Sequence, residues 1–255
     1  GPLNWQTGVY YFKEDADGYT NNYNSTTGAQ TSHLASRQTN KAAAVFGSVT
    51  YDLAKDLILR GGVRYTNDKK EFGTVAAENV VQIGPRSVDE SKSKANWDLS
   101  LTYKVNPDVS TYARIATGFR APSIAAASAS VPITVADAET ITSYEAGVKA
   151  DLFNRRARAS FSVYDYEVKN QQLTVVGGNS NVTRLINADK TSGRGVEADF
   201  EAFITPAFKV SAGGSYNFTK IKDPSLSVAK CGSCTVTDPI NAAGLVSING
   251  NALPQ

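Results

Sequence analysis

The feature that most constrains the fold of this chain is a period-two alternation of apolar and polar side chains along most of its length. In the segment 143–152 the apolar residues are Tyr144, Ala146, Val148, Ala150 and Leu152, and each intervening residue is polar or glycine. The segment 97–105 alternates in the same way, with Trp97, Leu99, Leu101, Tyr103 and Val105 as its apolar residues. A strand with this period has one apolar and one polar face, so the chain is expected to form β-sheet whose two faces differ in polarity.

The connections between these segments alternate between short and long. Tight turns are predicted at 54–56, 106–108, 154–156 and around Pro206, whereas long polar loops are predicted at 14–36, 70–91, after Gly118 and at 175–193. A further polar loop is predicted from Asp223 to the end of the sequence. Long loops at one end of up-and-down strands and short turns at the other are typical of transmembrane barrels. The predicted fold is therefore all-β, an up-and-down antiparallel transmembrane β-barrel, of which the chain supplies about nine strands.

Composition excludes some classes of protein and leaves others open. The net charge is +2 with basic and acidic residues interspersed, which argues against a nucleic-acid partner. No run of about 18 apolar residues is present, so a transmembrane helix is not expected. A soluble β-sandwich that buries the apolar face and acts as a binding module is one alternative, and a passive porin-like barrel is another. The chain lacks methionine and begins Gly1-Pro2, from which we expect an internal segment of a longer protein, with a scar of protease cleavage as the alternative origin of Gly1-Pro2.

Several motifs, in order, resemble the β-barrel of TonB-dependent outer-membrane receptors. They are NKAAAVFG at 40–47, GGVRYTNDKK at 61–70, TGFRAPS at 117–123, Glu139, YEAGVK at 144–149 and GRGVE at 193–197. The pair GFRAPS and YEAGVK is the most specific part of this resemblance, which covers nearly the whole chain.

The resemblance implies a barrel of about 22 strands, closed by an N-terminal plug domain and energised by TonB. On this interpretation residues 1–255 are a segment of the barrel domain, and the plug, the TonB box and the C-terminal strands lie outside it. The implied location is the bacterial outer membrane, with its lipid as one partner. The implied function is part of an active transporter for a scarce nutrient, with an iron–siderophore complex as the expected substrate.

In a barrel of this kind the charged face lines the lumen. The predicted lumen-facing residues are Arg60, Arg64, Asp98, Lys104, Glu145, Lys149, Asp151, Glu197, Asp199 and Glu201, although solvated surface charge is an equally ordinary role for any one of them. Tyr19 and Tyr23 are candidate ligand contacts, because exposed aromatic rings among Asn and Gly can stack on a sugar or chelator, although incidental loop tyrosines are the more ordinary explanation. Phe119 and Arg120 are also candidates, and the resemblance favours a role for them in fixing the exit of the loop from its strand.

Cys231 and Cys234 form a C-x-x-C motif in a loop. A redox motif needs a strand-to-helix context and zinc needs a second ligand pair, so a local disulfide is favoured in the oxidising environment outside the cell. Glu14, Asp15 and Asp17 lack the spacing of a calcium loop. We expect no metal, no cofactor and no enzyme activity, since no catalytic set of residues has supporting context.

Overall fold

The structure, a computed structural model, describes residues 1–80, 84–126, 132–178, 182–232 and 236–253. Its main element is one antiparallel sheet of nine strands in the order β1-β2-β3-β4-β5-β8-β9-β10-β11. These strands are β1 (Leu3–Tyr23), β2 (Gln30–Ala54), β3 (Leu57–Glu78), β4 (Ser87–Asn106), β5 (Val109–Arg120), β8 (Glu139–Leu152), β9 (Ala157–Gly177), β10 (Val182–Thr205) and β11 (Phe208–Ile221). The prediction of an all-β fold with about nine up-and-down strands is confirmed.

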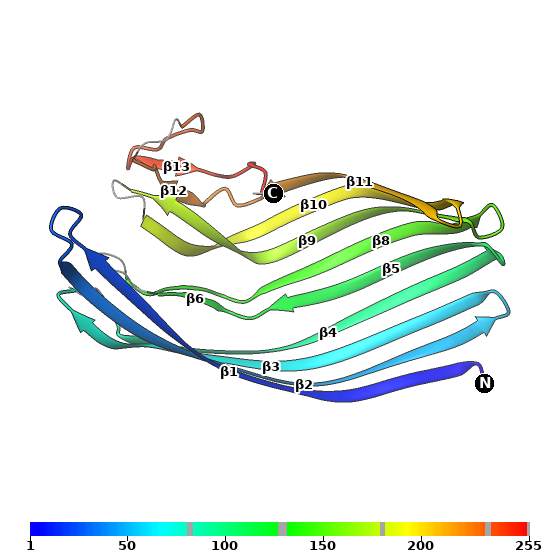
Figure 1. The fold of residues 1–255 in the computed structure, drawn as a ribbon, viewed down its shortest axis with the longest axis horizontal. Helices are drawn as coiled ribbons and strands as arrows, with labels where there is room; N and C mark the ends of the chain where they lie inside the picture. Colours follow the sequence, from blue (N-terminus) through cyan, green and yellow to red (C-terminus); the bar gives the residue numbers. More distant parts are fainter. Residues whose placement is uncertain (81–83, 127–131, 179–181, 233–235, 254–255) are drawn as a thin grey trace.

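The short and long connections lie at opposite ends of the sheet. Each strand of this sheet pairs with the next strand of the same sheet along the chain, so that β5 pairs with β8. The short turns gather at the end where the N-terminus lies (Figure 1). At the other end the connections are longer, and the one between β5 and β8 contains a small hairpin of β6 (Ser123–Ala125) and β7 (Thr134–Ala136). The predicted one-sided distribution of loops is therefore present.

Several predicted loops are instead continuations of the strands. The predicted loop 14–36 is mostly the outer part of β1 and β2, and the strands also extend into the predicted loops 70–91 and 175–193. The predicted loop after Asp223 contains two short paired strands, β12 (Ser227–Ala229) and β13 (Leu245–Ser247). These predictions were wrong because no regular alternation of apolar and polar residues marks the strand extensions. The extension of β1 is mostly polar, and that of β3 carries Phe72 and Val75 among polar residues and glycine. Polar cross-strand pairs hold them together, such as Arg37 with Asp17 at 2.7 Å.

The apolar face of the sheet is exposed rather than packed against a second sheet. Register places four large apolar side chains on this face. Their exposed fractions are 70% for Trp5, 57% for Val63, 44% for Trp97 and 55% for Tyr144. The alternative of a sandwich with Trp and Leu buried between two sheets is therefore wrong. Among the described residues there is no helix long and apolar enough to cross a membrane.

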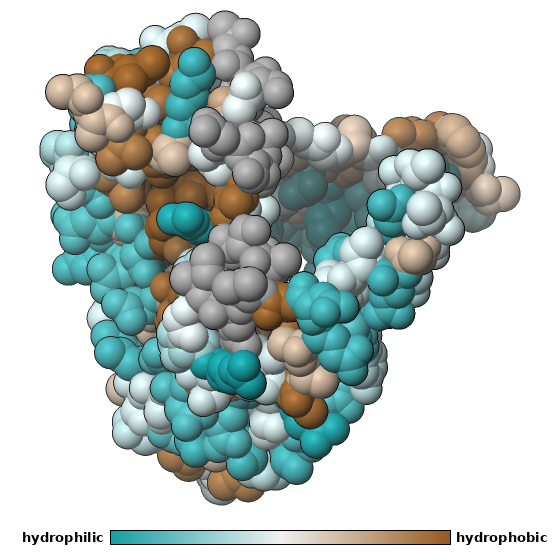
Figure 2. All heavy atoms as spheres, turned by 90° about the vertical axis from the view of Figure 1, so that its left-hand side faces the viewer, coloured by the Kyte–Doolittle hydropathy of each residue, from teal (hydrophilic) through white to brown (hydrophobic). Residues whose placement is uncertain are grey.

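The sheet is curved and remains open between its two edges. Viewed along the strands, the molecule forms a trough with β1 and β11 at its rims (Figures 1 and 2). The clearest apolar core of the described residues is small and joins the β6–β7 hairpin to β3, through Ile133 and Phe72, which are 8% and 6% exposed. An open sheet with so little core depends on its surroundings for stability.

Candidate functional site on the polar face

All ten residues predicted to line a lumen lie on the same face of the sheet, called the polar face below. The register passes from strand to strand without a change of face. Ser100 lies opposite Arg60 and Arg114, Arg114 lies opposite Glu145, and Ser160 lies opposite both Lys149 and Asp199. The remaining residues of the set, Arg64, Asp98, Lys104, Asp151, Glu197 and Glu201, follow by alternation along the same strands. The structure thus brings these charges onto one continuous surface.

Aromatic rings accompany the charges on the polar face. The guanidinium carbon of Arg64 lies 5.1 Å from the centre of the Tyr10 ring and 5.7 Å from that of Phe46. The same side chain donates from Nε to Oγ1 of Thr66 at 3.0 Å. Stacking on two rings and a hydrogen bond together hold this cation at a fixed position on the wall.

Tyrosines of the polar face rest on glycines of the neighbouring strand. A Cβ at Gly193 would lie 2.2 Å from the ring of Tyr166, and one at Gly147 would lie 2.7 Å from the ring of Tyr112. Only glycine leaves room for a ring to lie flat on the next strand. The hydroxyl of Tyr112 in turn hydrogen-bonds the carboxylate of Glu145. The rings therefore form a smooth, hydrogen-bonding surface beside the charges.

Shallow hollows lie between these side chains. One of about 330 Å³ is bordered by Arg60, Arg64, Asp98 and Arg114 among its lining residues. Another of about 400 Å³ lies between Arg158, Asp199 and Glu201 near the short-turn end. Ion pairs fix several of the charges, including Asp151 with Arg158 at 3.0 Å and Glu201 with Lys209 at 2.7 Å. Both signs are present, which makes the surface hydrophilic without selecting one charge.

The β6–β7 hairpin lies over the polar face at the long-loop end. Its Ile133 packs against Phe72 of β3, with Val88 of β4 beside them, and alternation from Arg64 and Asn96 places both of these β3 and β4 side chains on the polar face. On the other side the hairpin contacts β10, where the backbone N–H of Leu185 donates to Oγ1 of Thr134 at 3.1 Å. The hairpin therefore bridges strands that are not neighbours in the sheet.

The buried side chain of Gln172 holds both ends of the β5–β8 connection. Its Nε2 donates to the carbonyl oxygens of Ala121 at 2.8 Å and Asp137 at 3.0 Å, and its Oε1 accepts from Oγ of Ser123 at 2.6 Å. The side chain of Asn187 adds two more bonds to the backbone of Asp137, at 2.7 and 3.0 Å. The connection is thus attached to β9 and β10 at its entry and at its exit.

The four predicted ligand contacts are not gathered in one place. Arg120 lies on the polar face, where its guanidinium is 3.8 Å from the carboxylate of Glu139, and the adjacent Phe119 points to the opposite face. Tyr19 and Tyr23 lie near the tip of β1, 68% and 60% exposed, and Tyr19 stacks against His33 at 6.4 Å between ring centres. Register places Tyr19 on the side that continues the apolar face.

The cysteine motif lies in the segment after β11. Cys231 is disulfide-bonded, whereas Cys234, its predicted partner, lies outside the described residues. Asp223 fixes the start of this segment by accepting from the backbone N–H of Asp189 at 2.9 Å and from Oγ of Ser225 at 2.7 Å. These bonds, led by that from Asp189, lower the pKa of Asp223 from its ordinary value of 3.8. Within the described ranges no cluster of three or more metal-binding side chains is found.

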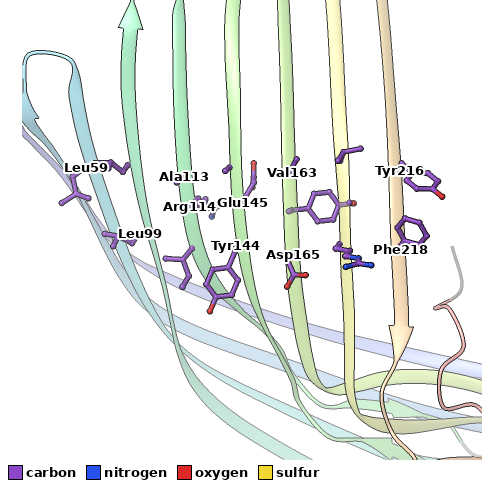
Figure 3. Close-up of a pocket in the computed structure, with 17 residues that line it drawn as sticks. Leu59, Leu99, Ala113, Arg114, Tyr144, Glu145, Val163, Asp165, Tyr216 and Phe218 are labelled. Carbon is purple, nitrogen blue, oxygen red and sulfur yellow. The ribbon is translucent and has the colours of Figure 1, made fainter.

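An open hollow of about 1000 Å³ lies on the apolar face (Figure 3). Its apolar wall runs across the sheet and includes Leu59, Leu99, Leu101, Ile115, Tyr144, Val163, Val196, Tyr216 and Phe218. Its surface is mainly hydrocarbon, which suits lipid chains rather than a charged solute.

Some polar-face residues could not be identified from the sequence. In the sequence nothing distinguishes Tyr112, Tyr166 and Gln172 from other strand residues, because the residue opposite each of them depends on register. The glycines at 147 and 193 are the only local signal, since glycine inside a strand suggests close approach by another group.

The comparisons with known proteins agree with this geometry. The family model described as TonB dependent receptor-like, beta-barrel, matches residues 1–255. The chain belongs to the TonB-dependent receptor family.

Solved structures of several siderophore and ferric-chelate receptors share its fold. The siderophore receptor PiuA of Acinetobacter baumannii superimposes with a TM-score of 0.72 at 17% identity, over 100% of this chain and 40% of PiuA. The ferric yersiniabactin uptake receptor FyuA of Yersinia pestis gives 0.67 at 16% identity, over 87% of this chain and 33% of FyuA. The ferric-catecholate import receptor Fiu of E. coli K12 gives 0.66 at 14% identity, over 96% of this chain and 37% of Fiu.

Membership of the TonB-dependent receptor family places the chain in the bacterial outer membrane. The exposed apolar face of the sheet is then its lipid-contacting surface, and the predicted partial barrel is confirmed. The chain spans about two fifths or less of the length of these three receptors.

Proposed function

We propose that this chain is a wall segment of a TonB-dependent transporter that takes up a ferric siderophore. The arrangement that carries the proposal is a continuous charged and aromatic face on the side of the sheet opposite the lipid-contacting face. A barrel needs such a face to surround a hydrophilic plug or a hydrated substrate. In this proposal the ten charged residues line the lumen, and residues 1–255 form part of one barrel domain.

Further strands and a plug domain complete the transporter in this proposal. The edge strands β1 and β11 each have one neighbour in the sheet, and unpaired backbone groups along a long strand are costly in a membrane. Additional strands of the same barrel would pair with both edges. TonB, acting through the plug, would supply the energy for transport, and the protein would carry out transport rather than a chemical reaction.

The β6–β7 hairpin is proposed to narrow the outer mouth of the lumen. It crosses the polar face and is attached on both sides, so an incoming solute passes beside it rather than displacing it. Arg120, Tyr19 and Tyr23 are the proposed substrate contacts, and Phe119 on the opposite face is proposed to fix the end of β5. A guanidinium on the lumen side and exposed aromatic rings at the rim suit an anionic iron chelate.

Uptake assays in cells test the proposal. The complete receptor that carries this chain is expressed in a strain lacking its own siderophore receptors, and growth under iron limitation is measured with a panel of ferric siderophores. We expect growth with at least one siderophore, abolished when TonB is deleted. Growth independent of TonB would instead support the passive porin. Receptor-dependent accumulation of copper, without growth on any ferric siderophore, would reject the iron-chelate assignment, since one structure with the same fold is a copper transporter.

A further inference from the structure

We infer that Lys13, Lys41 and Lys69 form a binding surface for the phosphate groups of outer-membrane lipid. The three lysines lie side by side on β1, β2 and β3, because register places Lys13 opposite Lys41 and Lys41 opposite Lys69. They lie on the face that carries the lipid-contacting side chains, at the point where that face changes from apolar to charged.

The position of the row relative to the apolar band supports this inference. On β1, Lys13 is the next residue on the same face after Tyr11, which is 70% exposed. On β3, Lys69 is the second residue on the same face after Tyr65, which is 51% exposed. Tyrosines in barrels concentrate at the level of the lipid headgroups. Cations one or two steps farther from the hydrocarbon meet the anionic groups of those headgroups.

The charges around the lysines are arranged in layers. Directly opposed like charges destabilise a sheet, so three adjacent ammonium groups need counter-charges. The structure supplies Asp15, 2.8 Å from Lys13, and Glu71, 2.5 Å from Lys69 and 3.9 Å from Lys41. These carboxylates, with Asp89 opposite Glu71, lie one alternation farther from the apolar band, about 7 Å along the strands.

This layering leaves the ammonium groups nearest the membrane and the carboxylates beyond them. The lysine side chains are 47%, 41% and 47% exposed, so they are accessible to a headgroup. A lysine has a flexible stem and can turn its ammonium group from the carboxylate toward the bilayer surface. The surface is therefore complementary to an anionic lipid, and the inference depends on the membrane location rather than on any transported substrate.

Lipid binding by the complete receptor in neutral detergent tests the inference. Native mass spectrometry measures retention of phosphatidic acid, a phosphate-monoester lipid, and of phosphatidylcholine with the same acyl chains. We expect preferential retention of phosphatidic acid, and we expect the K13Q/K41Q/K69Q variant to lose affinity for it by at least about 5-fold, the effect of one effective cation.

A matched control is available on the polar face of neighbouring strands. Lys70, Lys92 and Lys94 lie on β3 and β4 and alternate onto that face, so K70Q/K92Q/K94Q removes the same charge away from lipid. This control is expected to stay within 2-fold of the wild type. Equal losses in both variants, equal retention of both lipids, or complete displacement by inorganic phosphate would each overturn the inference. Thermal unfolding of each variant confirms that the proteins compared are folded.

Discussion

The side chain of Gln172 in β9 donates a hydrogen bond to the carbonyl oxygen of Asp137, 3.0 Å away and just beyond β7. The same nitrogen bonds Ala121, so one amide fixes both ends of the connection that carries the β6–β7 hairpin. Because the side chain is buried, its polar atoms cannot exchange these partners for water without local opening.

Replacing Gln172 with leucine should release the hairpin from the polar face. The substitution removes both donors and leaves the two carbonyl oxygens without this partner. We expect faster amide exchange in Ser123–Ala136 by about 10-fold or more, consistent with a cost of at least about 1–3 kcal/mol for an unsatisfied buried group. Hydrogen exchange measured by mass spectrometry on the complete receptor checks this, and unchanged exchange would remove Gln172 from its proposed role.

Leu101→Lys should destabilise the barrel, whereas Thr102→Lys should not. Leu101 lies in the middle of the apolar run of β4 and is 40% exposed toward lipid, while the adjacent Thr102 points to the polar face. A lysine on the lipid-contacting face costs about 2–4 kcal/mol near the bilayer midplane. Unfolding by denaturant in lipid vesicles measures the difference, and equal stabilities would contradict the assignment of the two faces.

Gly193→Ala should cost about 1–3 kcal/mol of stability, because the new methyl group collides with the ring of Tyr166. Gly214→Ala is the matched control, since a Cβ at Gly214 meets nothing within 4 Å. Thermal unfolding followed by circular dichroism distinguishes the two variants. The double substitution G193A with Tyr166→Ala should recover part of the loss, since the collision is then absent.

The attachment of the segment after β11 should weaken in acid. The folded-state pKa of Asp223 is lowered below its ordinary value of 3.8, so this carboxylate stabilises the attachment above that value, and the stabilisation is lost as pH falls through the folded-state pKa. Limited proteolysis between pH 6 and pH 3 should show increasing cleavage in residues 224–253. Asp223→Asn should be cleaved more readily at pH 6 and show a weaker dependence on pH.

The alternation of apolar and polar residues, as in the segment from Trp97 to Val105, determined where the central parts of the strands lie and which residues occupy each of their two faces. That pattern is local, and it follows from the period of two in a strand, so it can be observed without coordinates. The ten predicted charged residues of β3, β4, β8 and β10 lie on one face of the sheet for the same reason, because side-chain direction alternates along each strand.

The tertiary structure decided what depends on register and on contacts between distant residues. The outer parts of β1 and β2 have no alternation, so only their pairing shows that 14–36 is mostly strand. The position of Tyr166 over Gly193 and the bonds of Gln172 to both ends of the β5–β8 connection join residues that no local pattern relates. The sequence by itself therefore determined which residues face lipid, and the fold decided which polar residues meet, because side-chain direction is local whereas neighbours across a sheet are set by pairing.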